Sequence, residues 1–96
     1  MTLLEQTYSL LHCAGLVRST AGFSRQYIGR NRNWYAWQKH AGRDIGAAAA
    51  VQCLRSIRTQ LQAPSVNSTQ RLALTAVETV LLEHLQERYA VADVCA

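Results

Sequence analysis

The C-terminal third of the sequence is the feature that most constrains the fold. Residues 67–92 contain no glycine or proline, and their apolar residues recur three or four positions apart. On a helix, this spacing gathers them into one wide stripe, formed by Leu74, Val77, Val80, Leu81, Leu85 and Tyr89. Asn67 or Ser68 is suited to begin this helix. In a chain of 96 residues, a helix of this length has to pack against most of the other elements.

The N-terminal segment shows the same period. Leu3, Leu4, Tyr8 and Leu11 stand at helical spacings, and we expect a helix over residues 3–17. Thr2 and Glu5 fit a capping box, in which a hydroxyl and a carboxylate satisfy exposed amides reciprocally.

Two short helices are predicted next. Ser19 or Thr20 can cap the first, which we expect to run to about Ile28 and to end at Gly29. The second covers residues 34–41 and ends at Gly42. We expect Trp34, Trp37 and Ala41 to share its buried face, since they are three and four positions apart.

A fourth helix is predicted from Asp44, acting as its N-cap, to about residue 62, where Ala63-Pro64-Ser65 stops it. Its expected buried stripe is Ile45, Ala48, Ala49, Cys53, Ile57 and Leu61. No segment shows the alternation of a β-strand. The sequence therefore predicts one all-α domain over residues 1–96, with about five helices.

The sequence also predicts a cellular location. The three cysteines are widely spaced, which favours a reducing compartment. The N-terminus has no basic lead and carries Glu5 in its apolar run, so we expect no signal peptide. No apolar run approaches the roughly 20 residues of a membrane span. We expect a cytoplasmic protein.

Charge is concentrated in the middle of the chain. Residues 23–43 hold five of the ten Lys and Arg residues, His40, both tryptophans and two tyrosines, with no acidic residue. Residues 18–58 contain eight Lys or Arg and only Asp44 on the acidic side, whereas the two ends are weakly acidic. A block of one sign points to a polyanionic partner, although a solvated basic face is the simpler alternative.

This block resembles a helix-turn-helix domain of the phage-repressor type. Residues 24–29 (SRQYIG) match its first helix and turn, and residues 30–38 (RNRNWYAWQ) match its turn and recognition helix. Gly29, Ile28 and Tyr35 stand where the motif has glycine and apolar residues. Arg25 departs from it, because the motif has a small residue there. The block is also similar to one in small uncharacterised bacterial helical proteins, which implies no activity.

The repressor resemblance implies a helix-turn-helix-like core at residues 19–62 and binding to double-stranded DNA. The recognition helix would enter the major groove, where Arg fits guanine and Asn or Gln fits adenine. The candidate base-reading residues are Asn31, Arg32, Asn33 and Gln38. The candidate phosphate contacts are Arg25, Arg30, Lys39, His40 and Arg43, and Tyr35 is the candidate aromatic contact with an unpaired base.

One such unit reads few bases, so we expect a dimeric transcriptional regulator. The long helix over residues 67–92 is the expected oligomerisation element, through Leu74, Val77, Leu81, Leu85 and Tyr89. The alternative is a non-enzymatic homo-oligomer or adaptor that binds a protein partner through this apolar helix.

Catalysis is the least favoured class. The carboxylates are dispersed, and His12, His40 and His84 fall in three different helices without a paired nucleophile. The adjacent His12 and Cys13 have no second pair nearby, so we predict no metal site. No cofactor is predicted either.

Overall fold

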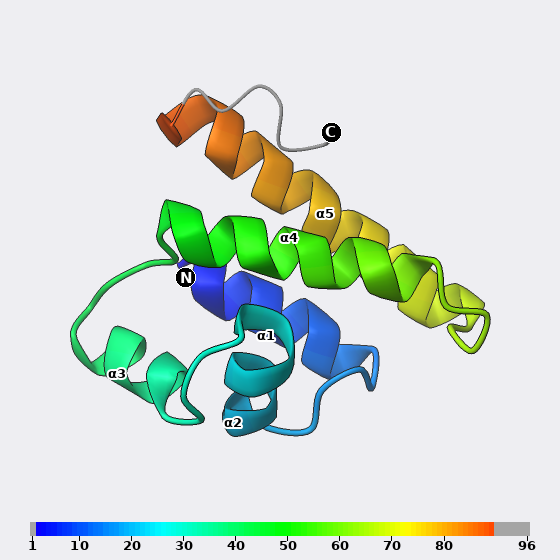
Figure 1. Cartoon of the computed structure of the whole chain (residues 1–96), viewed down its shortest axis with the longest axis horizontal. Coiled ribbons are helices and arrows are strands. Elements are labelled where there is room, and N and C mark those ends of the chain that lie inside the picture. Colours follow the sequence, from blue (N-terminus) through cyan, green and yellow to red (C-terminus); the bar gives the residue numbers. More distant parts are fainter. Residues whose placement is uncertain (1, 90–96) are drawn as a thin grey trace.

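The computed structural model describes the backbone of residues 2–89 and the side chains of residues 2–87, and this part of the chain is all-helical, as predicted. Its elements are α1 (Leu3–Cys13), α2 (Thr20–Phe23), the π-helical η1 (Ser24–Ile28), α3 (Trp34–His40), α4 (Ala47–Leu61) and α5 (Ser68–Tyr89). α4 and α5 form an antiparallel pair, and α1 lies beside them (Figure 1). α2 and α3 lie on the side of the molecule away from α5 (Figure 1).

A single hydrophobic core joins these elements. α1, η1, α4 and α5 all contribute side chains that are at most 2% exposed, among them Leu4, Leu11, Ile28, Leu54, Ile57, Leu74 and Leu81. α4 packs on both η1 and α5, and α1 also packs on α5. The core therefore lies between the α4–α5 pair and α1, and α2 with α3 is added at its edge.

The stripe predicted on the last helix lies inside the chain. Leu74, Val77, Leu81 and Leu85 are each 0% exposed and belong to the core cluster. They cannot form an oligomerisation surface while the chain is folded in this way. The fifth predicted contact, Tyr89, has a side chain outside the described part. Leu72, at 73% exposed, is the large apolar residue that α5 presents to solvent.

α1 ends four residues earlier than predicted. Its last residue is Cys13, Ala14 caps it, and Gly15 follows with φ = 76°. This left-handed conformation is favourable for glycine and terminates many helices. The helix predicted over residues 3–17 therefore includes Gly15, which ends it, and Leu16 and Val17 belong to the following loop.

Asp44 caps a helix other than the predicted one. Its carboxylate accepts hydrogen bonds from the Leu3 N–H at 3.1 Å and the Leu4 N–H at 2.8 Å, both at the start of α1. The N-cap of α4 is Gly46, two residues further along the chain. Asp44 therefore ties the loop after α3 to the N-terminus of α1, which no local sequence pattern indicates.

The capping box is only half formed. The Thr2 hydroxyl accepts the Glu5 N–H at 3.2 Å, as predicted, but the Glu5 carboxylate accepts the Thr2 hydroxyl at 3.1 Å instead of a backbone amide. The amides of Leu3 and Leu4 are satisfied by Asp44 instead.

The α4 stripe is also rotated from its predicted position. Ala49, Cys53 and Ile57 are buried as expected, but Ala48 is exposed and Leu54 is buried in its place. The shift follows from η1, which packs on the same helix and covers a second side of it.

Substitution of Asp44 tests the capping role. Loss of an N-capping side chain costs about 0.5–2 kcal/mol, so Asp44→Ala should lower the free energy of unfolding by about 1 kcal/mol at pH 7. Burial raises the pKa of Asp44, but three backbone hydrogen bonds, from Leu4, Ile45 and Leu3, and the nearby His84 outweigh this and hold the pKa below its ordinary value of 3.8.

Because the folded-state pKa is lowered, this stabilisation is present above pH 3.8 and is lost as the pH falls through the folded-state value. Denaturant titrations of both proteins should therefore differ at neutral pH and converge in acid. Glu83→Ala, which removes an exposed carboxylate of α5, is the matched control and should be neutral. Equal stability of Asp44→Ala and wild type at pH 7 would contradict the assignment.

Candidate nucleic-acid interface

Four aromatic rings attach the basic part of the chain to the rest of the molecule. Tyr8 of α1 lies 5.8 Å from Phe23 of α2 and 5.2 Å from Tyr35 of α3, measured between ring centroids. Phe23 lies 6.0 Å from both Tyr35 and Tyr27 of η1. Three of these pairs are tilted or edge-to-face, as aromatic pairs prefer. The cluster fixes the position of α3, since it joins α3 to both α1 and α2.

A buried hydroxyl adds a polar link between η1 and α3. Ser24 is 0% exposed, and its hydroxyl donates to the Thr20 carbonyl at 2.9 Å while accepting the Tyr35 N–H at 3.1 Å. The second bond satisfies an amide in the first turn of α3, where no intrahelical partner exists. The orientation of α3 therefore depends on hydrogen bonding as well as on ring packing.

The helical segment before the turn to α3 begins and ends where the sequence predicts, but its second half is the π-helical η1. The Ser19 hydroxyl accepts the Gly22 N–H at 3.1 Å and begins α2, and Gly29 ends η1 with φ = 70°. The Tyr27 carbonyl lies in the last turn of η1, where a helix leaves its carbonyls without intrahelical partners, and the Ser56 hydroxyl of α4 lies 3.0 Å from it. This hydroxyl is also 3.1 Å from the Gln52 carbonyl and can donate to one of the two at a time.

Tyr35 is unavailable for contact with a base. It is 5% exposed, and its ring packs against Tyr8 and Phe23. Burial, with smaller contributions from Glu5 and Tyr8, raises the pKa of Tyr35 above its ordinary value of 10.0. The prediction of an aromatic contact at this residue is wrong, whereas its apolar packing position matches the one that the repressor resemblance implies.

Among the Phe, Trp and Tyr side chains of residues 2–87, the exposed one is Trp37. Its side chain is 59% exposed, whereas we expected it in the core with Trp34, which is half-buried. Ala41, the third member of that predicted face, is exposed as well. The inner side of α3 carries Tyr35, Trp34 and Gln38 instead. Asn33, Ala36, Trp37 and His40 form the opposite, solvent-facing side, which we call the outer face of α3.

The arrangement of aromatics in the sequence contains a signal for this outcome. Successive residues of an α-helix are about 100° apart, so Trp34 and Trp37 lie about 60° apart, whereas Tyr35 points about 160° away from Trp37. A helix at the edge of a domain buries one side, and one of the three rings has to face solvent. Burial of Tyr35 leaves Trp37 outside.

The predicted phosphate contacts are all exposed. Arg32, one of the predicted base readers, is exposed too. We call these six side chains the basic surface: Arg25, Arg30, Arg32, Lys39, His40 and Arg43. They come from η1, the turn after it, α3 and the loop after α3, segments that lie together away from α5 (Figure 1). Within residues 2–87, none of them forms an ion pair with a carboxylate.

The predicted base readers differ from one another in availability. Arg32 and Asn33 have exposed side chains. The Asn31 side-chain oxygen accepts the Asn33 N–H at 2.9 Å, so it stabilises the turn. Gln38 is half-buried, and its amide donates to the Asp44 carbonyl at 3.4 Å. Arg32 and Asn33 are therefore the base readers that the geometry leaves best placed.

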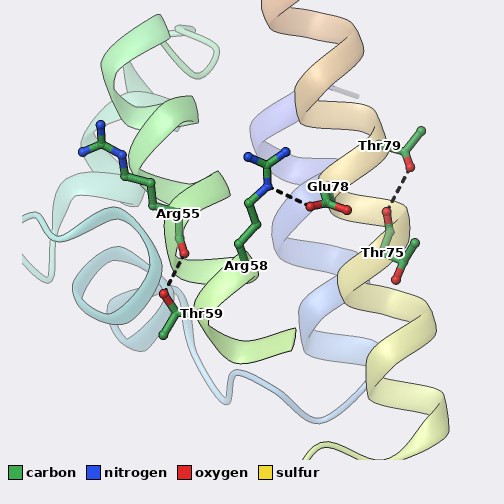
Figure 2. Close-up of polar contacts among 6 residues, drawn as sticks. All are labelled: Arg55, Arg58, Thr59, Thr75, Glu78 and Thr79. Atoms are coloured by element: carbon green, nitrogen blue, oxygen red, sulfur yellow. Dashed lines mark hydrogen bonds and ion pairs between the residues drawn. The ribbon is translucent and has the colours of Figure 1, made fainter. Parts of the chain in front are cut away.

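The cations of α4 have different environments. Arg58 forms an ion pair with Glu78 of α5 at 2.9 Å, whereas Arg55, less than one turn away, extends away from α5 (Figure 2). Arg58 therefore joins the two long helices. Arg55 adds an exposed cation on a side of α4 other than the one that faces α5.

Two shallow hollows lie beside η1. One has a volume of ≈ 390 Å³ and is lined by Gln26, Tyr27, Ser56, Thr59 and Gln60. The other has a volume of ≈ 290 Å³ and is lined by Gly22, Arg25 and Gln26. Tyr27 donates a short hydrogen bond to the side chain of Gln60 across the first. Polar side chains take part in the lining of both, and the second borders the basic surface at Arg25.

A comparison with protein families places the chain. Residues 4–93 match the model of a family of unknown function (DUF6626). The chain belongs to this family. No curated protein and no solved structure matches it.

Within residues 2–87, no group of three His, Cys, Asp or Glu side chains is placed to hold a metal ion. No helix in the described range is long and apolar enough to cross a membrane. Burial raises the pKa of the Cys53 thiol to about 12, so it stays protonated at neutral pH.

A pair of substitutions separates the packing and surface roles of the α3 aromatics. Tyr35→Ala should lower the free energy of unfolding by about 3 kcal/mol, because it removes a buried ring. Trp37→Ala should change it by less than about 0.5 kcal/mol, because the ring faces solvent. Urea titrations followed by circular dichroism measure both values. A large loss of stability in Trp37→Ala would show that this ring packs in the folded protein.

Proposed function

We propose that this protein binds nucleic acid, and DNA in the first place, through the basic surface. The observation that carries the proposal is a set of six exposed cationic or titratable side chains from consecutive segments, with no carboxylate paired to them in the described part of the chain. The acidic residue within this region, Asp44, directs its carboxylate at the amides of α1.

The electrostatics favour a polyanion. Each phosphate that a Lys or Arg neutralises releases condensed counterions, which supplies affinity without sequence preference. Exposed Glu83 and Glu87 stand on α5, which lies away from α2 and α3 (Figure 1). A nucleic acid would therefore be attracted to the α2–α3 side and repelled from part of α5.

The local geometry suits presentation of a short helix. η1 ends at Gly29, α3 begins five residues later, and Tyr35 packs back onto Phe23. Arg32 and Asn33 lie at the start of α3, where a groove-reading helix places its base contacts. A transcriptional regulator built on this unit would need two copies, and a dimer contact would have to use residues other than the buried stripe of α5.

The adaptor alternative is less well supported. It needs an apolar helix open to a partner, and the apolar residues of α5 that suggested it are in the core of the same chain. Leu72 alone is a small apolar surface compared with a stable protein interface.

Substitutions in the basic surface test the proposal. Arg30→Ala and Lys39→Ala should each weaken binding to all duplexes by a similar factor and flatten the dependence of log K on log salt by about one unit. Arg32→Ala with Asn33→Ala should instead remove any preference among sequences, at a cost of about 1–3 kcal/mol for each lost base contact. Fluorescence anisotropy with a random duplex pool at two salt concentrations measures the first effect.

Arg71→Ala is the matched control, because it removes an exposed cation from α5. It should leave the salt dependence almost unchanged. If Arg30→Ala, Lys39→Ala and Arg71→Ala all bind as wild type does, or if folded wild-type protein binds nothing at low salt, the basic surface is only a solvated face.

A further inference from the structure

We propose that Trp37 is a stacking platform for an unpaired nucleobase, so that the basic surface binds single-stranded nucleic acid more tightly than duplex. This inference rests on the proposed function, since it concerns the same surface and makes the class of ligand specific.

Exposure of Trp37 is the first observation. Trp37 and Leu72 are the two large hydrophobic residues that are exposed in the described part of the chain. Within residues 2–87, the indole of Trp37 has no ring partner and no hydrogen bond. A bare indole of this size is an unused hydrophobic area that a bound planar ring would cover.

Rigidity of the support is the second observation. Trp37 stands on a helix that is fixed by Tyr35, buried against Tyr8 and Phe23, and by the Ser24 hydroxyl. It has only two side-chain torsions, so ordering it on binding costs little entropy. The ring is therefore presented in a nearly prepared position.

Chemistry of the neighbours selects the occupant. His40 and Asn33 share the outer face of α3 with Trp37, and exposed Arg32 directly precedes Asn33 in the turn. Exposed Lys39 lies about 160° from Trp37 around the helix, so it faces another side of α3. A single strand offers unstacked base faces and phosphates together, which matches an exposed ring on the helix that also carries part of the basic surface. An intact duplex hides its base faces by stacking, so an indole has nothing to stack on unless base steps are opened. A neutral protein partner would leave the cations of the basic surface without counter-charges.

The ligand preference is measured directly with wild-type protein. The two probes are a fluorescein-labelled oligo-dT of about 16 nucleotides, which cannot pair with itself, and a mixed-sequence duplex of equal length. Anisotropy titrations at about 50 and 200 mM salt should show tighter binding of the single strand. Trp37→Ala should weaken single-strand binding by about 5- to 150-fold and leave duplex binding unchanged. Trp37→Phe, which keeps a ring, should retain part of the affinity.

Fluorescence locates the contact. In a Trp34→Phe variant the remaining tryptophan is Trp37, and its emission should be quenched when oligo-dT is added, as a stacked indole is. In a Trp37→Phe variant the remaining emission comes from half-buried Trp34 and should change little. The two variants are matched, since each keeps one tryptophan and one phenylalanine in α3.

The outcomes separate this inference from the proposed function. Equal binding of both probes, salt-dependent and insensitive to Trp37→Ala, would overturn the stacking platform and leave nucleic-acid binding in place. No binding of either probe by the folded protein at low salt would overturn both. Quenching in the Trp34→Phe variant together with a loss of affinity in Trp37→Ala would establish the stacked base.

Discussion

The packing of Phe23 between Tyr8, Tyr27 and Tyr35 is the interaction on which the arrangement of the basic region depends. α3 has only seven residues, far too few to be stable alone in water. Its position comes from the rings and from the Ser24 hydroxyl beneath them. Without these contacts the outer face of α3 would have no fixed orientation, and the cations around it would belong to a mobile loop.

This construction separates stability from surface chemistry. The residues that hold α3 in place are buried, whereas Trp37, His40 and the cations of the basic surface contribute little to the core. Because these side chains make few packing contacts in the core, substitutions among them should change the surface chemistry more than the stability. The apolar stripe of α5 is a poor candidate for a partner surface, because it is buried against α4 and α1 in the same chain.

The sequence predicted the helices well and their long-range contacts poorly. Ser19, Gly29 and Pro64 signalled boundaries by local chemistry, and the all-helical class followed from apolar spacing. Asp44 was assigned to the nearest helix, because its actual partners are the amides of residues about forty positions away. A cap predicted from sequence is assumed to accept amides of the helix that follows it. Here the loop that carries Asp44 lies against the N-terminus of α1, and the carboxylate accepts the amides of that helix.

Trp37 shows the same limit for the candidate site. Apolar spacing grouped it with Trp34 and Ala41, but periodicity does not say which of several apolar directions faces the core. That choice was made by Tyr8 and Phe23, which offer a ring-lined site that Tyr35 fills. With Tyr35 inside, the geometry of a helix turns Trp37 outward. The exposed indole is therefore a consequence of core packing elsewhere, and it stands on the same short helix as Lys39 and His40 of the basic surface.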